Sequence, residues 1–246
     1  MKAVILAAGV GSRLAPLTND RPKVLVEILG RSFLFRQLDL LTAAGIPSRD
    51  VVVVGGYRID RLREELLRGG YECEVVVNDR YEPWNNFYSL LVAQAALDGH
   101  DFLQLDGDVV LDGKLLPRMI AAPGEALLAV DCRDELDEET MKVQLEGDRV
   151  AAIAKPLDPA RCAGEYIGVT KLSAAAARQV FAELATFPAA QLTHEYYEHA
   201  FHRLSSAGRV PFGIVDVHDC TVLEIDNVED LRRAEALLAQ ADARAR

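Results

Sequence analysis

The sequence lacks any run of apolar residues that approaches the roughly 20 needed to cross a bilayer as a helix. It also has only four cysteines, which lie far apart and form neither a CxxC pair nor a Cys/His pattern with metal-ligand spacing. Neither a structural zinc site nor a secreted disulfide framework is therefore expected. The apolar run at residues 3–8 is short and leads directly into glycines, without the cleavage site of a signal peptide. These absences predict a cytoplasmic protein with reduced thiols.

Basic residues are the minority among the charged ones: 27 lysines and arginines stand against 38 aspartates and glutamates, which gives a formal charge of −11. This excess of negative charge repels phosphate backbones, so neither nucleic acid nor an anionic membrane is an expected partner. A local cationic pocket for one small anion is still compatible with the balance. Gly/Ser/Pro-rich linkers and internal repeats are also missing. The 246 residues therefore predict one domain, as a monomer or a homodimer.

The first half of the chain alternates strand and helix patterns. Residues 3–8 and 51–54 are continuous apolar runs next to glycine, as in parallel strands that are buried on both faces. Helical spacing of apolar residues follows each run, first from a cap at Ser32 to Gly45 and then over residues 58–68. This half predicts a Rossmann-like, doubly wound α/β fold, in which a mostly parallel, mixed sheet carries helices on both faces.

The pattern changes near residue 125, where strands become more frequent. Residues 142–145 and 150–153 form a hairpin pattern across Gly147-Asp148. The other expected elements are strands at 74–77, 101–105, 126–130, 166–172, 215–217 and 222–225, and helices at 87–97, 174–185, 192–205 and 228–241. We therefore expect a smaller antiparallel lobe beside the parallel sheet.

The first strand leads into a loop that combines glycines with two cations. Gly9 and Gly11 allow the backbone to pass close to a bulky ligand and to aim N–H groups at phosphate oxygens. Arg13 offers a planar fork and Lys23 a point charge to the same anion. The third glycine of a dinucleotide fingerprint and the GK[ST] of a Walker loop are both missing. Taken alone, the fragment is more typical of a glycine turn beside two solvated cations.

Residues 6–23 as a whole resemble the signature of the nucleotidyltransferase superfamily that couples NTPs to phosphorylated sugars and alcohols, L-A-A-G-x-G-(S/T)-R-L-x-P-L-T-x-x-x-P-K. The resemblance implies that the loop holds the triphosphate and that Lys23 contacts the α-phosphate region. Arg13 and Lys23 are then the catalytic cations. The nucleotide-binding residues that it implies in this loop are Leu6, Ala7, Ala8, Gly9, Gly11, Ser12 and Arg13.

Two short acidic strings are candidates for a metal site. Asp106 and Asp108 end a predicted strand, where doubly wound sheets bind ligands, and Mg²⁺ commonly takes one or two protein carboxylates. Strand alternation also places Glu224 and Asp226 on one face. The superfamily resemblance implies Asp108 and Asp226 as ligands of a Mg²⁺ cofactor and Asp106 as a nucleotide-binding residue. Capping of the turn after Asp108, or of the helix near Asn227, is the structural alternative.

The string W-N-N-F-Y-S-L at residues 84–90 replaces the Q-x-x-P-x-G-T-A stretch of sugar-phosphate members. It resembles CTP:phosphocholine cytidylyltransferases and their phosphonate- and inositol-phosphate-using relatives, which implies that Asn86 and Ser89 read cytosine. Asn85 is as well suited to cap the helix. The acceptor-binding residues implied by the resemblance are Lys155, Glu165, Tyr196 and Glu224. For Lys155, an exposed hairpin lysine is the alternative, and the sequence does not choose between a quaternary-ammonium and a phosphonate acceptor.

These observations predict a Mg²⁺-dependent cytidylyltransferase that moves CMP from CTP to a small phosphorylated alcohol or phosphonate and releases pyrophosphate. A sugar-1-phosphate nucleotidyltransferase using UTP, GTP or dTTP, and a non-catalytic nucleotide-sensing domain, are the alternatives. Residues 1–110 would form the nucleotide-binding half, 111–226 the acceptor-binding half and 227–246 a C-terminal helix. His194 and His199 are five residues apart, so a helix separates them by about 140° and they are not expected to bind zinc as a zincin pair.

Overall fold

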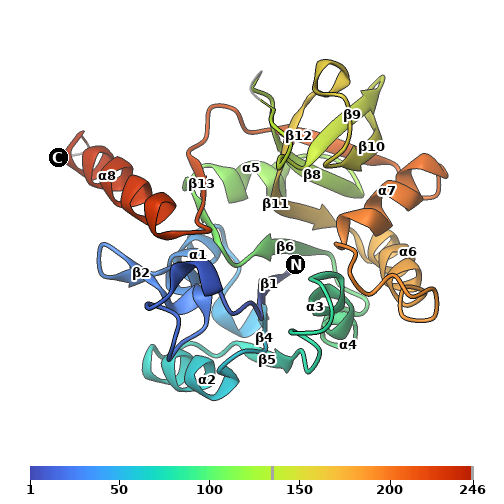
Figure 1. Cartoon of the computed structure of the whole chain (residues 1–246). Helices are drawn as coiled ribbons and strands as arrows, with labels where there is room; N and C mark the ends of the chain where they lie inside the picture. Colours follow the sequence, from blue (N-terminus) through green and yellow to red (C-terminus); the bar gives the residue numbers. More distant parts are fainter. Residues whose placement is uncertain (134–135, 245–246) are drawn as a thin grey trace.

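The computed structural model of the chain describes residues 1–133 and 136–244, with side chains as far as residue 240. Strand β1 (Lys2–Ala7) lies at the centre of the main sheet, parallel to β4 (Val51–Gly55) on one side and to β6 (Phe102–Asp106) on the other (Figure 1). Strand β5 (Glu74–Val77) continues the parallel part beyond β4. The predicted doubly wound, mostly parallel sheet is therefore confirmed.

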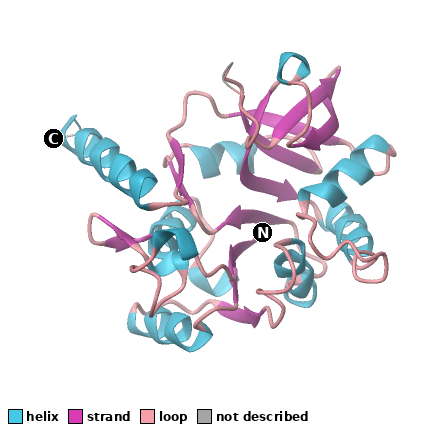
Figure 2. Cartoon of the chain, in the orientation of Figure 1, coloured by secondary structure: helices cyan, strands magenta, loops and turns pink. Residues whose placement is uncertain are grey.

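Apolar side chains of β1 alternate between two cores, which is why helices cover both faces (Figure 2). Ala3 and Ile5 pack with the apolar sides of three helices on one face, and Val4 packs with those of four helices on the other. The first set is α1 (Phe33–Ala43), α2 (Ile59–Arg68) and α5 (Leu115–Ala121), and the second is α3 (Phe87–Val92), α4 (Gln94–Leu97), α6 (Ala174–Leu184) and α7 (Glu198–Ser206). As expected, Ser32 caps α1 through its hydroxyl, which accepts a hydrogen bond from the Phe35 N–H at 3.3 Å.

The antiparallel part continues the same sheet beyond β6. Strand β11 pairs antiparallel with β6 through Val169–Leu172 and with β9 through Gly164 and Glu165, and it also pairs antiparallel with β8. Strands β9 and β10 form the predicted hairpin. Strand β12 lies parallel to β8 at the edge. These strands are β8 (Ala126–Asp131), β9 (Lys142–Glu146), β10 (Arg149–Ala154), β11 (Gly164–Leu172) and β12 (Phe212–Asp216).

A small separate sheet pairs the residues that follow β6 with those that precede the C-terminal helix. Strand β13 (Val222–Glu224) pairs antiparallel with β7 (Val109–Leu111), directly before the C-terminal helix α8 (Val228–Arg244). Helix α8 packs on a separate apolar cluster that includes Leu14. The remaining short elements are the strands β2 (Glu27–Ile28) and β3 (Arg31–Ser32) and the 3-10 helices Ser12–Leu14, Lys23–Leu25, Ser48–Asp50 and Pro159–Arg161. None of the helices in the described residues is long and apolar enough to cross a membrane.

Two helix predictions were wrong in their bounds. The helix expected over 87–97 is split into α3 and α4, and the one expected over 192–205 begins only at Glu198. Before that point the carbonyls of Thr193 and His194 accept hydrogen bonds from the backbone N–H and the side-chain amide of Asn85, both at 2.9 Å. The backbone there is tied to the loop before α3, and within residues 192–197, all of which the structure describes, only the Glu195 N–H makes a turn-type bond, to the Leu192 carbonyl at 3.3 Å.

Candidate active site

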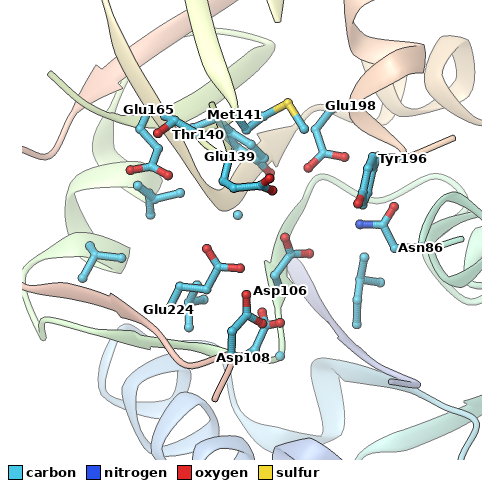
Figure 3. A pocket seen from close by; sticks show the side chains of 18 of the residues that line it. Asn86, Asp106, Asp108, Glu139, Thr140, Met141, Glu165, Tyr196, Glu198 and Glu224 are labelled. Atoms are coloured by element: carbon cyan, nitrogen blue, oxygen red, sulfur yellow. The ribbon is translucent and has the colours of Figure 1, made fainter. Parts of the chain in front are cut away.

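A cavity of about 770 Å³ lies at the carboxyl ends of β1 and β6, the edge at which doubly wound sheets bind ligands. Carboxylates from distant parts of the chain face this space (Figure 3). The residues predicted from the sequence that line it are Leu6, Ala8, Gly9, Arg13, Asn86, Ser89, Asp106, Asp108, Lys155, Glu165, Tyr196, Glu224 and Asp226. Ala7, Gly11, Ser12 and Lys23 are not among the lining residues.

Three carboxylates come together at one end of the cavity. The pairing of β7 with β13 sets Glu224 opposite Val109, and one oxygen each of Asp108, Glu224 and Asp226 lies within 4.8 Å of the others. Within residues 1–133 and 136–240 no other group of three such side chains has metal-ligand spacing. Hard oxygen donors at this density fit Mg²⁺. Crowding by the surrounding protein, together with the charges of Asp108 and Asp226, raises the pKa of Glu224 to about 7.

Asp226 is available for this cluster because another residue caps the helix that follows it. The side-chain oxygen of Asn227 accepts hydrogen bonds from the N–H groups of Glu229 and Asp230 at 2.9 and 3.0 Å. Asp230 in turn accepts from the N–H of Asp226 at 3.1 Å. The capping alternative for the Asp226 carboxylate is therefore wrong, since the helix obtains its cap from Asn227.

Lys23 reaches the same carboxylates from beneath the cavity. Its ammonium donates to Asp108 Oδ2 and to Asp226 Oδ1, each at 2.8 Å, and the residue is 9% exposed. Arg13, whose side chain is 68% exposed, pairs with the other oxygen of Asp226 at 2.9 Å. Burial works against the charged ammonium, but the two carboxylates outweigh it and raise the pKa of Lys23. Two carboxylates thus hold the cationic groups of Lys23 and Arg13 together at this end of the cavity.

The glycine loop packs closely around Lys23. Gly11 has a left-handed backbone, with φ 71°, and a Cβ at this position would lie 2.8 Å from the Cβ of Lys23. The Thr18 hydroxyl donates to the Gly11 carbonyl at 2.9 Å and closes the loop. Gly11 therefore supports the position of Lys23, which explains its place in the loop although it does not line the cavity.

Asp106 is held by a buried polar network that sequence reasoning missed. Its two carboxylate oxygens accept hydrogen bonds from the Tyr197 hydroxyl at 2.8 Å and from the Gln104 amide at 3.0 Å. Tyr166 joins the network through Gln104, to which its hydroxyl donates at 3.0 Å. Burial and the nearby charges of Glu198 and Asp108 raise the pKa of Asp106. A fully buried glutamine in an otherwise apolar strand was the available signal for this network.

The two residues predicted to read the base already have partners in the protein. Asn86 Oδ1 accepts a hydrogen bond from the backbone N–H of Tyr197 at 3.0 Å, which leaves its amide nitrogen toward the cavity (Figure 3). Ser89 accepts from the Asn78 amide at 2.9 Å. Asn85 is occupied with the 193–194 segment and does not bond to an N–H within α3. Asn86 therefore presents an N–H donor to a ligand.

The far end of the cavity holds three of the four residues predicted to bind the acceptor, whereas the fourth, Glu224, lies with Asp108 and Asp226. Lys155 pairs with Glu139 at 3.0 Å, and its ammonium lies 5.7 Å from the ring centre of Tyr196. Burial and the charge of Asp131 raise the pKa of Glu165. Glu198, the first residue of α7, was not predicted, because the helix was expected to begin six residues earlier. Burial raises the pKa of Glu198 to about 7.

The histidines of the 194–202 segment have protein partners. His199 Nδ1 pairs with Glu195 at 2.8 Å, and His202 Nδ1 accepts a hydrogen bond from the N–H of Ile153 at 3.3 Å. His194 lies before the first residue of α7, so the 140° rotation expected for a helix does not describe its position relative to His199.

Comparison with known proteins places these residues in a family. The sequence model of the MobA-like NTP transferase domain matches residues 3–203. The CMP-5'-(3-aminopropyl)phosphonate synthase of Streptomyces rubellomurinus is 32% identical over 247 residues, which is 96% of this chain and 38% of that protein. The choline-phosphate cytidylyltransferase of Streptococcus pneumoniae is 38% identical over 97 residues, 39% of this chain and 41% of that protein. The chain thus spans less than half the length of these curated relatives in the matched regions.

Solved structures show the same fold at low sequence identity. The CTP:phosphocholine cytidylyltransferase of Streptococcus pneumoniae superposes with a TM-score of 0.77 at 24% identity, covering 96% of this chain and 98% of that one. The inositol-1-phosphate CTP transferase of T. maritima superposes with a TM-score of 0.80 at 23% identity, covering 97% and 94%. The mixed sheet with helices on both faces is shared with both.

Proposed function

The chain belongs to the family of MobA-like NTP transferase domains, and on that premise we propose that it is a Mg²⁺-dependent cytidylyltransferase. It would transfer CMP from CTP to the phosphate or phosphonate oxygen of a small acceptor. The observation that carries the proposal is the convergence of Lys23 and Arg13 on Asp108 and Asp226, with separations of 2.8 to 2.9 Å, beside a glycine loop. Relatives that are named for CMP, CTP or cytidylyl transfer support the choice of nucleotide.

In the proposed reaction an acceptor oxygen attacks the α-phosphorus of CTP. A new P–O bond forms there, the bond from the α-phosphorus to the bridging oxygen breaks, and pyrophosphate leaves with that electron pair. Because a phosphate or phosphonate oxygen is already anionic near neutral pH, no general base is required, and the protein contributes alignment and charge neutralisation.

Each part of the cavity then has a task in this reaction. Asp108 and Asp226 would hold Mg²⁺, which neutralises phosphate charge when bound, and Glu224 stands within reach of the same ion. Lys23 and Arg13 supply fixed positive charge to the same place, and the backbone near Gly9 lines the space for the phosphates. Asn86 and Ser89, which both line the cavity, would contact the base.

The same residues give less support to the two alternative functions. A sensing domain without catalysis has no need to keep Lys23, Asp108 and Asp226, yet all three are present and in contact. A sugar-1-phosphate nucleotidyltransferase would be expected to carry the G-T-A turn that W-N-N-F-Y-S-L replaces.

The test is a pyrophosphate-release screen with Mg²⁺, in which CTP, UTP, GTP and dTTP are each combined with phosphocholine, 3-aminopropylphosphonate, inositol 1-phosphate and glucose 1-phosphate. We expect release that depends on CTP, on an acceptor other than glucose 1-phosphate, and on Mg²⁺. Removal of the metal by EDTA should stop release, and added Mg²⁺ should restore it. Equal rates with another NTP, or no release with any combination, would contradict the proposal.

A further inference from the structure

The end of the cavity away from Lys23, here called the acceptor end, is lined mainly by carboxylates. Asp131, Glu139, Glu165 and Glu198 reach it from β8, the segment before β9, β11 and α7, and Figure 3 shows the last three facing one space. Two of the four have cationic partners in the protein: Asp131 pairs with Arg133 at 2.6 Å and Glu139 with Lys155 at 3.0 Å. Among the described residues, Glu165 and Glu198 have no ion-pair partner.

Glu198 is the most constrained of these carboxylates. It is only 6% exposed, and its Oε2 is buried without a hydrogen-bond partner in the described part of the chain. Figure 3 shows this carboxylate turned into the cavity. The carboxylate is stabilised in part by hydrogen bonds from its own backbone and from Tyr197 and by the charge of Lys155. An oxygen that is buried without a hydrogen-bond partner is still costly for the fold. A bound ligand that supplies the missing hydrogen-bond donor and a positive charge reduces this unfavourable free energy.

The surroundings of Glu198 favour a cation as that ligand. Burial and the charge of Glu224 raise the pKa of Glu198, and the charge of Lys155 lowers it, so the net effect disfavours the bare carboxylate. Tyr196, 41% exposed, lines the same space two residues earlier. Its ring already has the Lys155 ammonium 5.7 Å from its centre, a distance typical of a cation–π contact.

We propose that the acceptor carries a positively charged amino group, which binds to Glu198 and is flanked by the ring of Tyr196. This inference rests on the proposed function and narrows its acceptor to aminoalkyl phosphates or phosphonates, in preference to neutral polyol or sugar phosphates. An ammonium group satisfies the free Glu198 oxygen and neutralises its charge in one contact. A neutral hydroxyl can donate to the same oxygen but does not favour the ionised carboxylate as an ammonium does, so this residue favours cationic over neutral acceptors.

Two probes that differ only in the amino group test this directly. In wild-type protein with CTP and Mg²⁺, kcat/KM from pyrophosphate release should be about 10- to 100-fold higher for 3-aminopropylphosphonate than for propylphosphonate. Glu198→Gln keeps the shape and removes the charge, so it should erase most of this preference by slowing the amine alone. Glu146→Gln, an exposed residue of the β9 hairpin, is the matched control and should change neither rate.

A second variant keeps the test decisive if Glu198→Gln folds poorly. Tyr196→Leu alters a half-exposed side chain and should lower kcat/KM for the amine by about threefold to tenfold, with little effect on propylphosphonate. The inference is overturned if propylphosphonate or inositol 1-phosphate reacts as well as the amine, or if Glu198→Gln slows both probes equally; the proposed function survives either result.

If CTP gives no pyrophosphate with any acceptor, the proposed function fails separately. Calorimetric binding of the two phosphonates without nucleotide then decides the inference. A preference for 3-aminopropylphosphonate that is lost in Glu198→Gln supports the amine site, whereas equal binding of the two probes refutes it.

Discussion

At the end of the cavity that would hold the triphosphate, Lys23 and Arg13 close on two carboxylates, whereas at the acceptor end Glu165 and Glu198 face the cavity with no cation paired to them. The first end carries its own counter-charges, so it is ordered before any ligand binds. The second leaves negative charge, which a ligand can neutralise. Under the proposed function, a single cavity would accept a polyanion at one end and favour a cation at the other, although the whole chain carries a formal charge of −11.

The largest effect is expected from removing one carboxylate at the triphosphate end. Asp108→Asn keeps the side-chain shape but removes a charged ligand from the three-carboxylate cluster, and we expect kcat/KM with CTP to fall by about 10³-fold or more. Lys23 keeps its bond to Asp226, so the thermal unfolding temperature should change little. Asp98→Asn, at an exposed position after α4, serves as the control. Activity near the wild-type level in Asp108→Asn would remove Asp108 from the metal site.

A smaller effect is expected where the triphosphate end meets the base. Asn86→Asp keeps an oxygen for the N–H of Tyr197 and replaces the amide nitrogen that faces the cavity. Since cytosine presents an acceptor where uracil presents a donor, we expect kcat/KM for CTP to fall about 10- to 100-fold while that for UTP falls less. The measurement is the CTP:UTP ratio of kcat/KM in both proteins. An unchanged ratio would show that another residue reads the base.

Tyr197 connects the two ends, because it lies beside Glu198 at the start of α7 and donates to Asp106 at 2.8 Å. Tyr197→Phe removes this bond and leaves the ring in place, so we expect kcat/KM to fall by about tenfold and unfolding to become about 1–2 kcal/mol easier. Tyr166→Phe disturbs the same network without losing a bond to Asp106 and should match the stability loss with a smaller loss of activity. Equal activity losses would mean that Tyr197 acts only through stability.

The two ends also differ in how far the sequence could predict them. The triphosphate end depends on one continuous string, residues 6–23, and on Asp108 and Asp226, whose roles the family resemblance implied. The antiparallel pairing of β7 with β13, which brings these two aspartates together, was not predicted. Local sequence patterns also predicted the main sheet and most helices. The acceptor end depends on contacts between residues far apart in the chain, such as Tyr197 with Asp106, and on the first residue of α7.

The error at α7 has an identifiable cause. The composition of residues 192–205 suits a helix, but the hydrogen bonds from Asn85 to Thr193 and His194 hold the first part in another conformation. Tertiary contacts of this kind override local propensity and are invisible in a single sequence. The shift moved Glu198 from the middle of an expected helix to its first turn at the edge of the cavity, which is why Glu198 was missed.

The smallest effect is expected on the unfolding free energy of the protein without ligand. It reports on the buried carboxylate of Glu198 at the acceptor end. Burial raises the pKa of Glu198 from 4.5 to about 7, so the folded state retains a proton that the unfolded chain releases in this range. The stabilisation from this group is complete below pH 4.5 and is lost as the pH rises through about 7. Glu198→Gln has no such dependence. Its unfolding free energy relative to wild type should therefore increase by about 1–3 kcal/mol between pH 5 and pH 8.

Urea unfolding at pH 5, 6, 7 and 8 measures this difference, with Glu146→Gln as the control that should show no such trend. A flat difference for Glu198→Gln would mean that the carboxylate is not desolvated in the folded protein, and the contrast between the two ends would then be lost. At pH 8, added 3-aminopropylphosphonate should make wild type more stable to unfolding than Glu198→Gln. The ligand compensates the carboxylate charge in wild type and has no such charge to neutralise in the variant. Propylphosphonate should not reverse this order of stability. The two titrations therefore separate the destabilisation by the buried carboxylate from its role in binding an amine.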